Sequence, residues 1–107
     1  MEFTKVKLVV TVPLSHADVV RQAMGDAGAG VVGNYSHCSF SVLGKGRFLA
    51  LDGANPHIGQ VGVPEVVEEE RIEVNCPVDK IDEIIIALKK VHPYDQVVYD
   101  VYPLLDY

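Results

Sequence analysis

The apolar residues of this chain recur at two spacings, one typical of β-strands and one typical of helices. Residues 5–12 and 66–76 place apolar side chains mostly at alternate positions, with charged or polar side chains between them, which predicts strands with one buried face. Two other segments have the i, i+3, i+4 spacing of amphipathic helices. Their apolar positions are Val20, Ala23, Met24 and Ala27 in the first, and Ile81, Ile84, Ile85 and Leu88 in the second.

Prolines, glycines and capping residues predict where these elements begin and end. Pro13 ends the first strand, and Pro77 ends the strand over residues 66–76. Gly28 and Gly30 end the first helix, because glycine readily adopts the left-handed conformation of a helix C-terminus. Two pairs of residues have the spacing of a capping box at a helix start: Ser15 with Asp18, and Asp79 with Asp82.

The middle of the chain predicts a β-hairpin. Residues 35–43 and 47–51 are each typical of a strand, and the Gly-Lys-Gly sequence at 44–46 offers two positions that are free to adopt positive φ. A loop rich in Gly, Pro and Asn then spans residues 52–64. The last predicted strand covers residues 97–102.

The order of these elements predicts an α+β fold in a single domain over residues 1–107. It is a ferredoxin-like β-α-β-β-α-β sandwich with one extra short hairpin strand. Two helices cover only one face of such a sheet. Period-two spacing assigns the other face to Val9, Thr11, Tyr35, His37, Ser39 and Ser41. This face could be solvated or covered by other subunits, and Val9, Tyr35 and Tyr99 favour a covered face and therefore a homo-oligomer.

Composition excludes several classes of protein. The net charge of −6 argues against nucleic-acid binding, which depends on basic patches. No apolar stretch is long enough to cross a membrane, and the first residues lack the pattern of a secretion signal. Two cysteines do not make a disulfide framework. We therefore expect a cytoplasmic protein with free thiols.

His37 and Cys38 are adjacent on a predicted strand, so their side chains should point to opposite faces and could not easily bind one metal ion. Cys38 shares its predicted face with Phe40 and is expected to be an inert core thiol. His37 is either a hydrogen-bonded histidine at a sheet surface or interface, or a ligand-binding residue. His57 is either an ordinary loop histidine or a partner that meets His37 through the hairpin.

Sequence motifs give no indication of catalysis. His92 is followed by Pro93 and Tyr94 at the end of the second helix, where a histidine favours the negative helix terminus. The chain contains no GxSxG, no HExxH and no CxxC sequence. The glycines at 53, 59 and 62 match no phosphate-binding signature. We therefore expect a protein that is not an enzyme.

Several segments together resemble the inserted domain of the Nif-three-like, YqfO-type dinuclear-metal-centre proteins. The segments are Gly-Asn-Tyr-Ser-His-Cys-Ser-Phe-Ser at 33–41, Gly-Lys-Gly-Arg-Phe at 44–48, Gly-Ala-Asn-Pro-His-Ile-Gly at 53–59, His-Pro-Tyr at 92–94, and residues 99–104. The resemblance covers nearly the whole chain, in order. It departs at residues 95–97, where Asp-Gln-Val stands in place of Glu-Glu-Pro.

This resemblance implies a fold of the PII and CutA type, which is often trimeric, in a stand-alone bacterial version of the inserted domain. The metal-binding halves of the full-length family are absent, so their hydrolase chemistry is not carried over. The resemblance favours a non-enzymatic, homo-oligomeric module that binds a small ligand or regulates a partner. Six residues are predicted to converge at the ligand site: Asn34, Tyr35, Ser36, His37, Asn55 and His57.

The alternative function is CutA-like binding of a divalent transition metal, since copper and zinc accept imidazole ligands. The candidate ligands are His37, His57 and His92, with Cys38 as an outside candidate. No other cofactor is expected.

Overall fold

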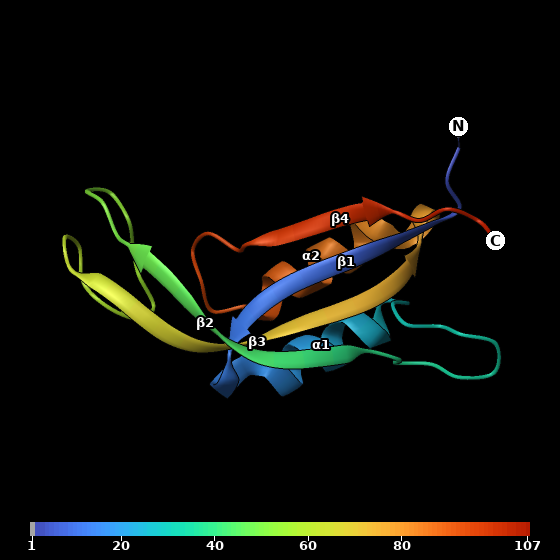
Figure 1. Ribbon diagram of the computed structural model, residues 1–107, viewed down its shortest axis with the longest axis horizontal. Helices are drawn as coiled ribbons and strands as arrows, with labels where there is room; N and C mark the ends of the chain where they lie inside the picture. Colours follow the sequence, from blue (N-terminus) through green and yellow to red (C-terminus); the bar gives the residue numbers. More distant parts are fainter. Residues whose placement is uncertain (1) are drawn as a thin grey trace.

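The computed structural model describes residues 2–107, which form a four-stranded antiparallel sheet with two helices on one face (Figure 1). The elements follow in the order β1 (Lys5–Pro13), α1 (Ala17–Asp26), β2 (Phe40–Leu49), β3 (Pro64–Pro77), α2 (Ile81–Val91) and β4 (Tyr99–Pro103). The strand order in the sheet is β2-β3-β1-β4. The predicted α+β, ferredoxin-like β-α-β-β-α-β fold is therefore confirmed.

The hydrophobic core lies between the sheet and the two helices, on the side that we call the helix face. Even-numbered residues of β1 and β3 point into it, from Val6 to Val12 and from Ile72 to Cys76. Val20 and Met24 of α1 and Ile84 and Leu88 of α2 pack against them and are fully buried. Burial raises the pKa of the Cys76 thiol to about 11, so this cysteine is an unreactive core residue.

The predicted hairpin within residues 35–51 is wrong, and residues 2–107 contain no extra strand. β2 continues from Phe40 to Leu49 through the Gly-Lys-Gly sequence, and every residue pairs with β3. Neither Gly44 nor Gly46 has a positive φ. β3 is 14 residues long and offers a pairing partner along the whole of β2, so the ladder overrides the local turn preference. The chain reverses later, in the loop between β2 and β3, where Gly53, Gly59 and Gly62 have positive φ.

Neither predicted capping box forms. Each helix is preceded by a short 3-10 turn, Leu14–His16 before α1 and Val78–Lys80 before α2. These turns make His16 and Lys80 the N-cap residues, and no side chain donates or accepts a capping hydrogen bond at either position. Ser15 instead bonds the neighbouring His16, with 2.8 Å between Oγ and Nδ1.

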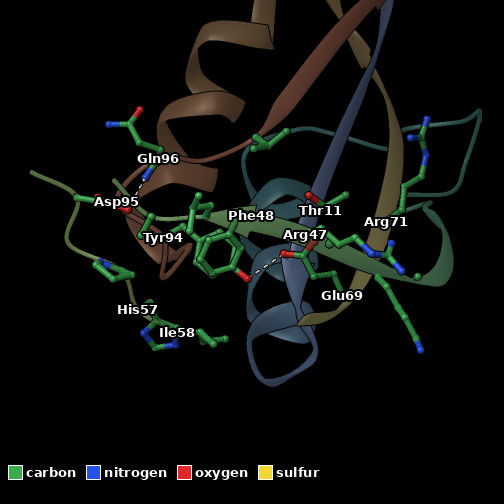
Figure 2. Close-up of a pocket in the computed structure, with 18 of the residues that line it drawn as sticks. Thr11, Arg47, Phe48, His57, Ile58, Glu69, Arg71, Tyr94, Asp95 and Gln96 are labelled. Atoms are coloured by element: carbon green, nitrogen blue, oxygen red, sulfur yellow. Dashed lines mark hydrogen bonds between the residues drawn. The ribbon is translucent and has the colours of Figure 1, made fainter. Parts of the chain in front are cut away.

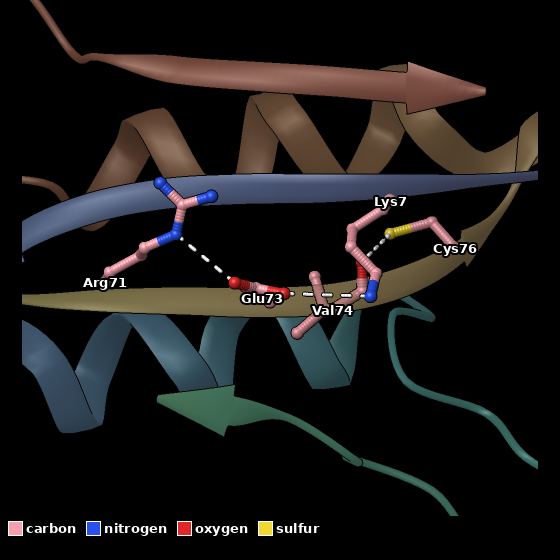
Figure 3. Close-up of polar contacts among 5 residues, drawn as sticks. All are labelled: Lys7, Arg71, Glu73, Val74 and Cys76. Atoms are coloured by element: carbon pink, nitrogen blue, oxygen red, sulfur yellow. Dashed lines mark hydrogen bonds and ion pairs between the residues drawn. The ribbon is translucent and has the colours of Figure 1, made fainter. Parts of the chain in front are cut away.

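The opposite side of the sheet, which we call the open face, carries charged side chains at its centre. Glu73 forms ion pairs with Lys7, at 3.6 Å, and with Arg71, at 3.2 Å (Figure 3). Val9 pairs with Glu73 in register and is only 3% exposed. None of the helices in residues 2–107 is long and apolar enough to cross a membrane.

The predicted assignment of side chains to the two faces fails in β2. Phe40 and Val42 pair with Glu73 and Arg71, so they lie on the open face, and Ser41 lies on the helix face. A shift of one residue inverts the faces of a strand. Tyr99 is also on the helix face, where its ring packs against the core and lies 5.1 Å from Lys89 Nζ.

Candidate functional site

A groove of about 730 Å³ lies where β2 and β3 continue past the end of β1. From Glu68 to Pro64, β3 pairs only with β2, and the two strands form an arm at one end of the molecule (Figure 1). The groove is bounded by this arm, by the loop that follows β2, and by residues 94–98 before β4. Its position therefore depends on the unbroken course of β2.

The walls of the groove are mainly apolar. Phe48, Leu49 and Ile58 contribute side chains to them, while Arg47 and Arg71 lie on one side of the groove (Figure 2). An apolar cavity with a few polar groups is the usual form of a small-molecule site.

A buried carboxylate lies at the groove and is held by a tyrosine. Glu69 is 9% exposed, and the Tyr94 hydroxyl donates a hydrogen bond of 2.8 Å to its Oε2 (Figure 2). Burial and the adjacent carboxylate raise the pKa of Tyr94, so the phenol stays protonated as the donor. A Cβ at Gly46 would lie 1.9 Å from Glu69 Oε1. The glycine therefore leaves the space that the carboxylate occupies.

His92 is buried and both of its ring nitrogens have partners. Nε2 donates to the Thr11 carbonyl oxygen at 2.8 Å, and Nδ1 accepts the backbone N–H of Tyr94 at 3.2 Å. Burial lowers the pKa of His92, which favours the neutral imidazole that this pattern requires. The geometry therefore does not support His92 as a metal ligand. It gives His92 the structural role of holding the segment that carries Tyr94.

Residues 31–38 form a projecting loop between α1 and β2, which we call the finger. At its tip, Val32 and Tyr35 exchange two backbone hydrogen bonds of 2.9 Å, and Gly33 has a φ of 55°. At its base, the Cys38 N–H donates to the Gly30 carbonyl at 2.9 Å. Tyr35 is 74% exposed. The prediction of Cys38 as a core thiol is wrong, because Cys38 lies half-buried at the base of the finger rather than on a strand.

His37 fastens the finger to the end of α1. Its Nε2 lies 2.9 Å from Asp26 Oδ1, and its Nδ1 lies 2.9 Å from Ser36 Oγ. The hydrogen bond between His37 and Asp26 lowers the pKa of the Asp26 carboxyl. A Cβ at Gly25 would lie 2.1 Å from the His37 ring, so the imidazole packs directly on the helix backbone. The residue adopts a φ of 59°, which is uncommon for a residue other than glycine.

His37 and His57 do not meet within one chain. His37 bonds Asp26, the last residue of α1, whereas the His57 ring is 5.5 Å from that of His16, just before α1 begins. Ten helical residues span about 15 Å. Because β2 continues as one strand instead of folding into a hairpin, it carries the loop after it away from the finger (Figure 1).

The six predicted ligand residues therefore form two groups. Asn34, Tyr35, Ser36 and His37 belong to the finger, and Asn55 and His57 belong to the loop beside the groove. The Asn55 backbone N–H donates to Asp95 Oδ2 at 3.0 Å, which ties this loop to the segment before β4. Within residues 2–107, no group of three or more His, Cys, Asp or Glu side chains has the arrangement of a metal site.

Sequence reasoning missed Glu69, Tyr94 and His16. Glu69 belongs to an acidic run that is typical of a solvated strand edge, yet it shares the open face with Arg71 and Glu73. Side chains of a strand alternate between its two faces, so the odd number of Glu69 predicts that it lies on a different face from its neighbours Glu68 and Glu70. His16 and His57 are 41 positions apart in the sequence, and no motif links them.

Comparisons with known proteins identify relatives that are much longer than this chain. No family model matches the chain. It is 50% identical over 98 residues to a Bacillus subtilis protein named GTP cyclohydrolase 1 type 2 homolog, covering 92% of this chain and 26% of that protein. A Mycobacterium tuberculosis protein of the same name is 46% identical over 99 residues, with the same coverage. The chain thus spans about a quarter of the length of these relatives.

Several solved structures have the same fold as this chain. A Bacillus cereus protein related to NIF3 superposes with a TM-score of 0.84 at 47% identity, over 97% of this chain and 26% of that one. The periplasmic divalent cation tolerance protein CutA from Archaeoglobus fulgidus gives a TM-score of 0.68 at 18% identity, over 94% and 83% of the two chains. B. subtilis GlnK, in a complex with ATP, gives 0.62 at 17%, over 95% and 84%. The last two likenesses concern the fold alone. As the resemblance in the sequence predicted, the chain is homologous to a segment of the NIF3-related proteins that has the fold of CutA and GlnK.

Proposed function

We propose that this chain is a non-enzymatic, homo-oligomeric module that binds a small ligand in the groove and serves a regulatory role. The groove is the observation that carries the proposal. Its volume of about 730 Å³ lies within the roughly 300–1,000 Å³ that is usual for small-molecule sites. Its apolar walls would bury a ring or chain, and its basic side chains would orient an anionic group.

Binding rather than catalysis fits the polar groups at the groove. The Tyr94 hydroxyl is committed to Glu69, and His92 is committed to two backbone groups. Each of these two side chains holds a neighbour in place, and neither is poised as a nucleophile with a free base beside it. The name of the longer relatives belongs to proteins of which the part matched by this chain makes up only 26%.

A homo-oligomer would reunite the two groups of predicted ligand residues. The finger and the groove lie at opposite ends of the molecule (Figure 1), so contact between them in neighbouring copies is head-to-tail. A repeated head-to-tail contact closes into a ring when the rotation permits, and a trimer is the ring that we favour. The exposed apolar side chains of Val32 and Tyr35 on the finger match the apolar groove of the next copy. Asn34, Tyr35, Ser36 and His37 would then lie near Asn55 and His57.

Ligand binding is tested by a thermal-shift panel of nucleotides on chelator-treated protein. ATP is one probe, because GlnK has this fold and is described in a complex with it. A ligand at 100 times its dissociation constant stabilises by about 2.7 kcal/mol. We expect Phe48→Ala, in the groove wall, to abolish the shift, and Phe40→Ala, outside the groove, to retain it. Equal shifts in both variants would remove the groove as the site.

Finger-to-groove contact is tested by disulfide trapping in a Cys38→Ser background. One copy carries Tyr35→Cys and a second carries Ala54→Cys, which lines the groove. Cross-linked dimers should form in the mixture and not with either protein alone. Ile86→Cys, on the exposed side of α2, replaces Ala54→Cys as the control. A strictly monomeric protein by light scattering would overturn the homo-oligomer.

A further inference from the structure

Two imidazoles meet beside the groove although they are far apart in the sequence. The rings of His16 and His57 have centroids 5.5 Å apart and planes at 86°. His16 ends the 3-10 turn before α1, and His57 lies in the loop after β2. We propose that this pair forms an open binding site for a divalent transition-metal ion, with water in the remaining coordination positions.

The separation of the rings, which is also that of an edge-to-face contact, is compatible with two ligands of one ion. A zinc–nitrogen bond of about 2.0–2.1 Å, together with roughly 1 Å from the nitrogen to the ring centre, places each ring centre about 3 Å from the ion. When the two nitrogen–metal bonds meet at a right angle, at the tetrahedral angle or at a somewhat wider angle, the two ring centres are about 4.5–6 Å apart. The observed 5.5 Å falls within this range. The rings are therefore close enough for rotation of the two side chains to bring a nitrogen of each to one ion.

One ring nitrogen of each histidine is available. His16 Nδ1 is 2.8 Å from Ser15 Oγ, which orients the ring and leaves Nε2 for a metal. Such a hydrogen bond to the second nitrogen is what usually supports a metal-binding histidine. Within residues 2–107, the His57 ring nitrogens form no hydrogen bond, and the side chain is exposed.

The chemistry of the donors selects the class of ion. Imidazole suits nickel, copper and zinc, whereas magnesium prefers oxygen ligands. Residues 2–107 supply no third His, Cys, Asp or Glu in a metal-binding arrangement, so water completes the coordination and the site stays open. An ion bound here would link the loop between β2 and β3 to the 3-10 turn before α1. His57 also lines the groove, but the metal site consists of two imidazoles and needs no small ligand in the groove, so the two proposals can fail independently.

Nickel titration tests the site directly. Ni²⁺ is titrated by calorimetry into the chelator-treated Cys38→Ser protein, which removes the half-buried thiol as a competing ligand. We expect one ion per chain and no binding of Mg²⁺ under the same conditions. His16→Ala and His57→Ala should each weaken nickel binding at least tenfold. His37→Ala is the matched control, because that imidazole is exposed but lies at the other end of α1.

The outcomes separate the proposal from its alternatives. Circular dichroism of each variant first shows that the fold is retained, which we expect since neither His16 nor His57 is buried. Copper bound to the wild-type protein should show nitrogen coupling from two imidazoles by electron paramagnetic resonance, and from at most one in either variant. Nickel affinity within twofold of the parent in His16→Ala or His57→Ala, an equal loss in His37→Ala, or no binding to the parent would each overturn the site.

Discussion

The hydrogen bond from Tyr94 to Glu69 allows a direct test of how the groove is held together. Tyr94→Phe removes one oxygen atom and leaves the ring in place. In the wild-type protein that oxygen donates a 2.8 Å bond to a carboxylate that is only 9% exposed. The variant leaves Oε2 without this donor while Oε1 still faces Gly46.

The expected loss follows from the charge and the burial of the acceptor. Hydrogen bonds to charged groups contribute about 1.5–3 kcal/mol, because an ionised group buried without a partner retains its desolvation penalty. For a domain of about this size, 1 kcal/mol changes the melting temperature by roughly 4–8 °C. Tyr94→Phe should therefore lower it by about 6 °C or more.

The assays are thermal denaturation and urea denaturation at neutral pH, both followed by circular dichroism, with Tyr35→Phe as the matched control. Tyr35 is 74% exposed, and removal of its hydroxyl should change the free energy of unfolding by less than about 0.5 kcal/mol. A double-mutant cycle with Glu69→Gln isolates the interaction between the two side chains. If Tyr94→Phe proves as stable as Tyr35→Phe, or if the cycle gives no coupling, the Tyr94–Glu69 bond does not stabilise the groove.

Three further predictions concern backbone space and protonation. Gly46→Ala should lower the melting temperature relative to Gly44→Ala, because a Cβ at 46 would lie 1.9 Å from Glu69 Oε1 and one at 44 meets nothing within 4 Å; equal melting temperatures would contradict this. Gly30→Ala should destabilise the protein, because Gly30 has a φ of 77° and its Cβ would lie 2.3 Å from a backbone oxygen of the finger base, and amide hydrogen exchange should show the finger opening. The pKa of His92 is lowered in the folded state, so the unfolded chain binds more protons and stability should fall as the pH drops below about 6.5, by up to roughly 1.4 kcal/mol per pH unit. His92→Gln should flatten that pH dependence in denaturation curves, and an unchanged slope would contradict the assignment.

The sequence predicted those parts of the fold in which one face of an element is buried. β1, α1 and α2 each place their apolar residues against a single core, so periodicity alone identifies them. β2 has no such pattern, since Phe40, Val42 and Leu43 are all substantially exposed. With no buried face to guide the prediction, the Gly-Lys-Gly sequence suggested a turn. Tertiary pairing with β3 overrides that local preference.

The candidate site was predicted less well because it depends on contacts between distant segments. Residues of the finger and of the loop beside the groove were both identified as special, from their glycines and histidines. The prediction that these two segments meet within one chain was wrong because it assumed a hairpin within residues 35–51, where the structure has the continuous strand β2. The contact between Tyr94 and Glu69 spans 25 residues, and it depends on how the segment after α2 crosses the end of β1. Hydrophobic periodicity carries no information on such a crossing.

The conformation of the finger, which is held by its own hydrogen bonds, lowers the entropic cost of binding a partner. Gly30, Gly33 and His37 all adopt positive φ within eight residues, and hydrogen bonds at the tip and the base hold them there. Ordering a flexible loop on binding costs conformational entropy, and a loop that is already ordered avoids that cost. A partner that recognises the finger through Tyr35 would therefore bind it without a coupled folding step.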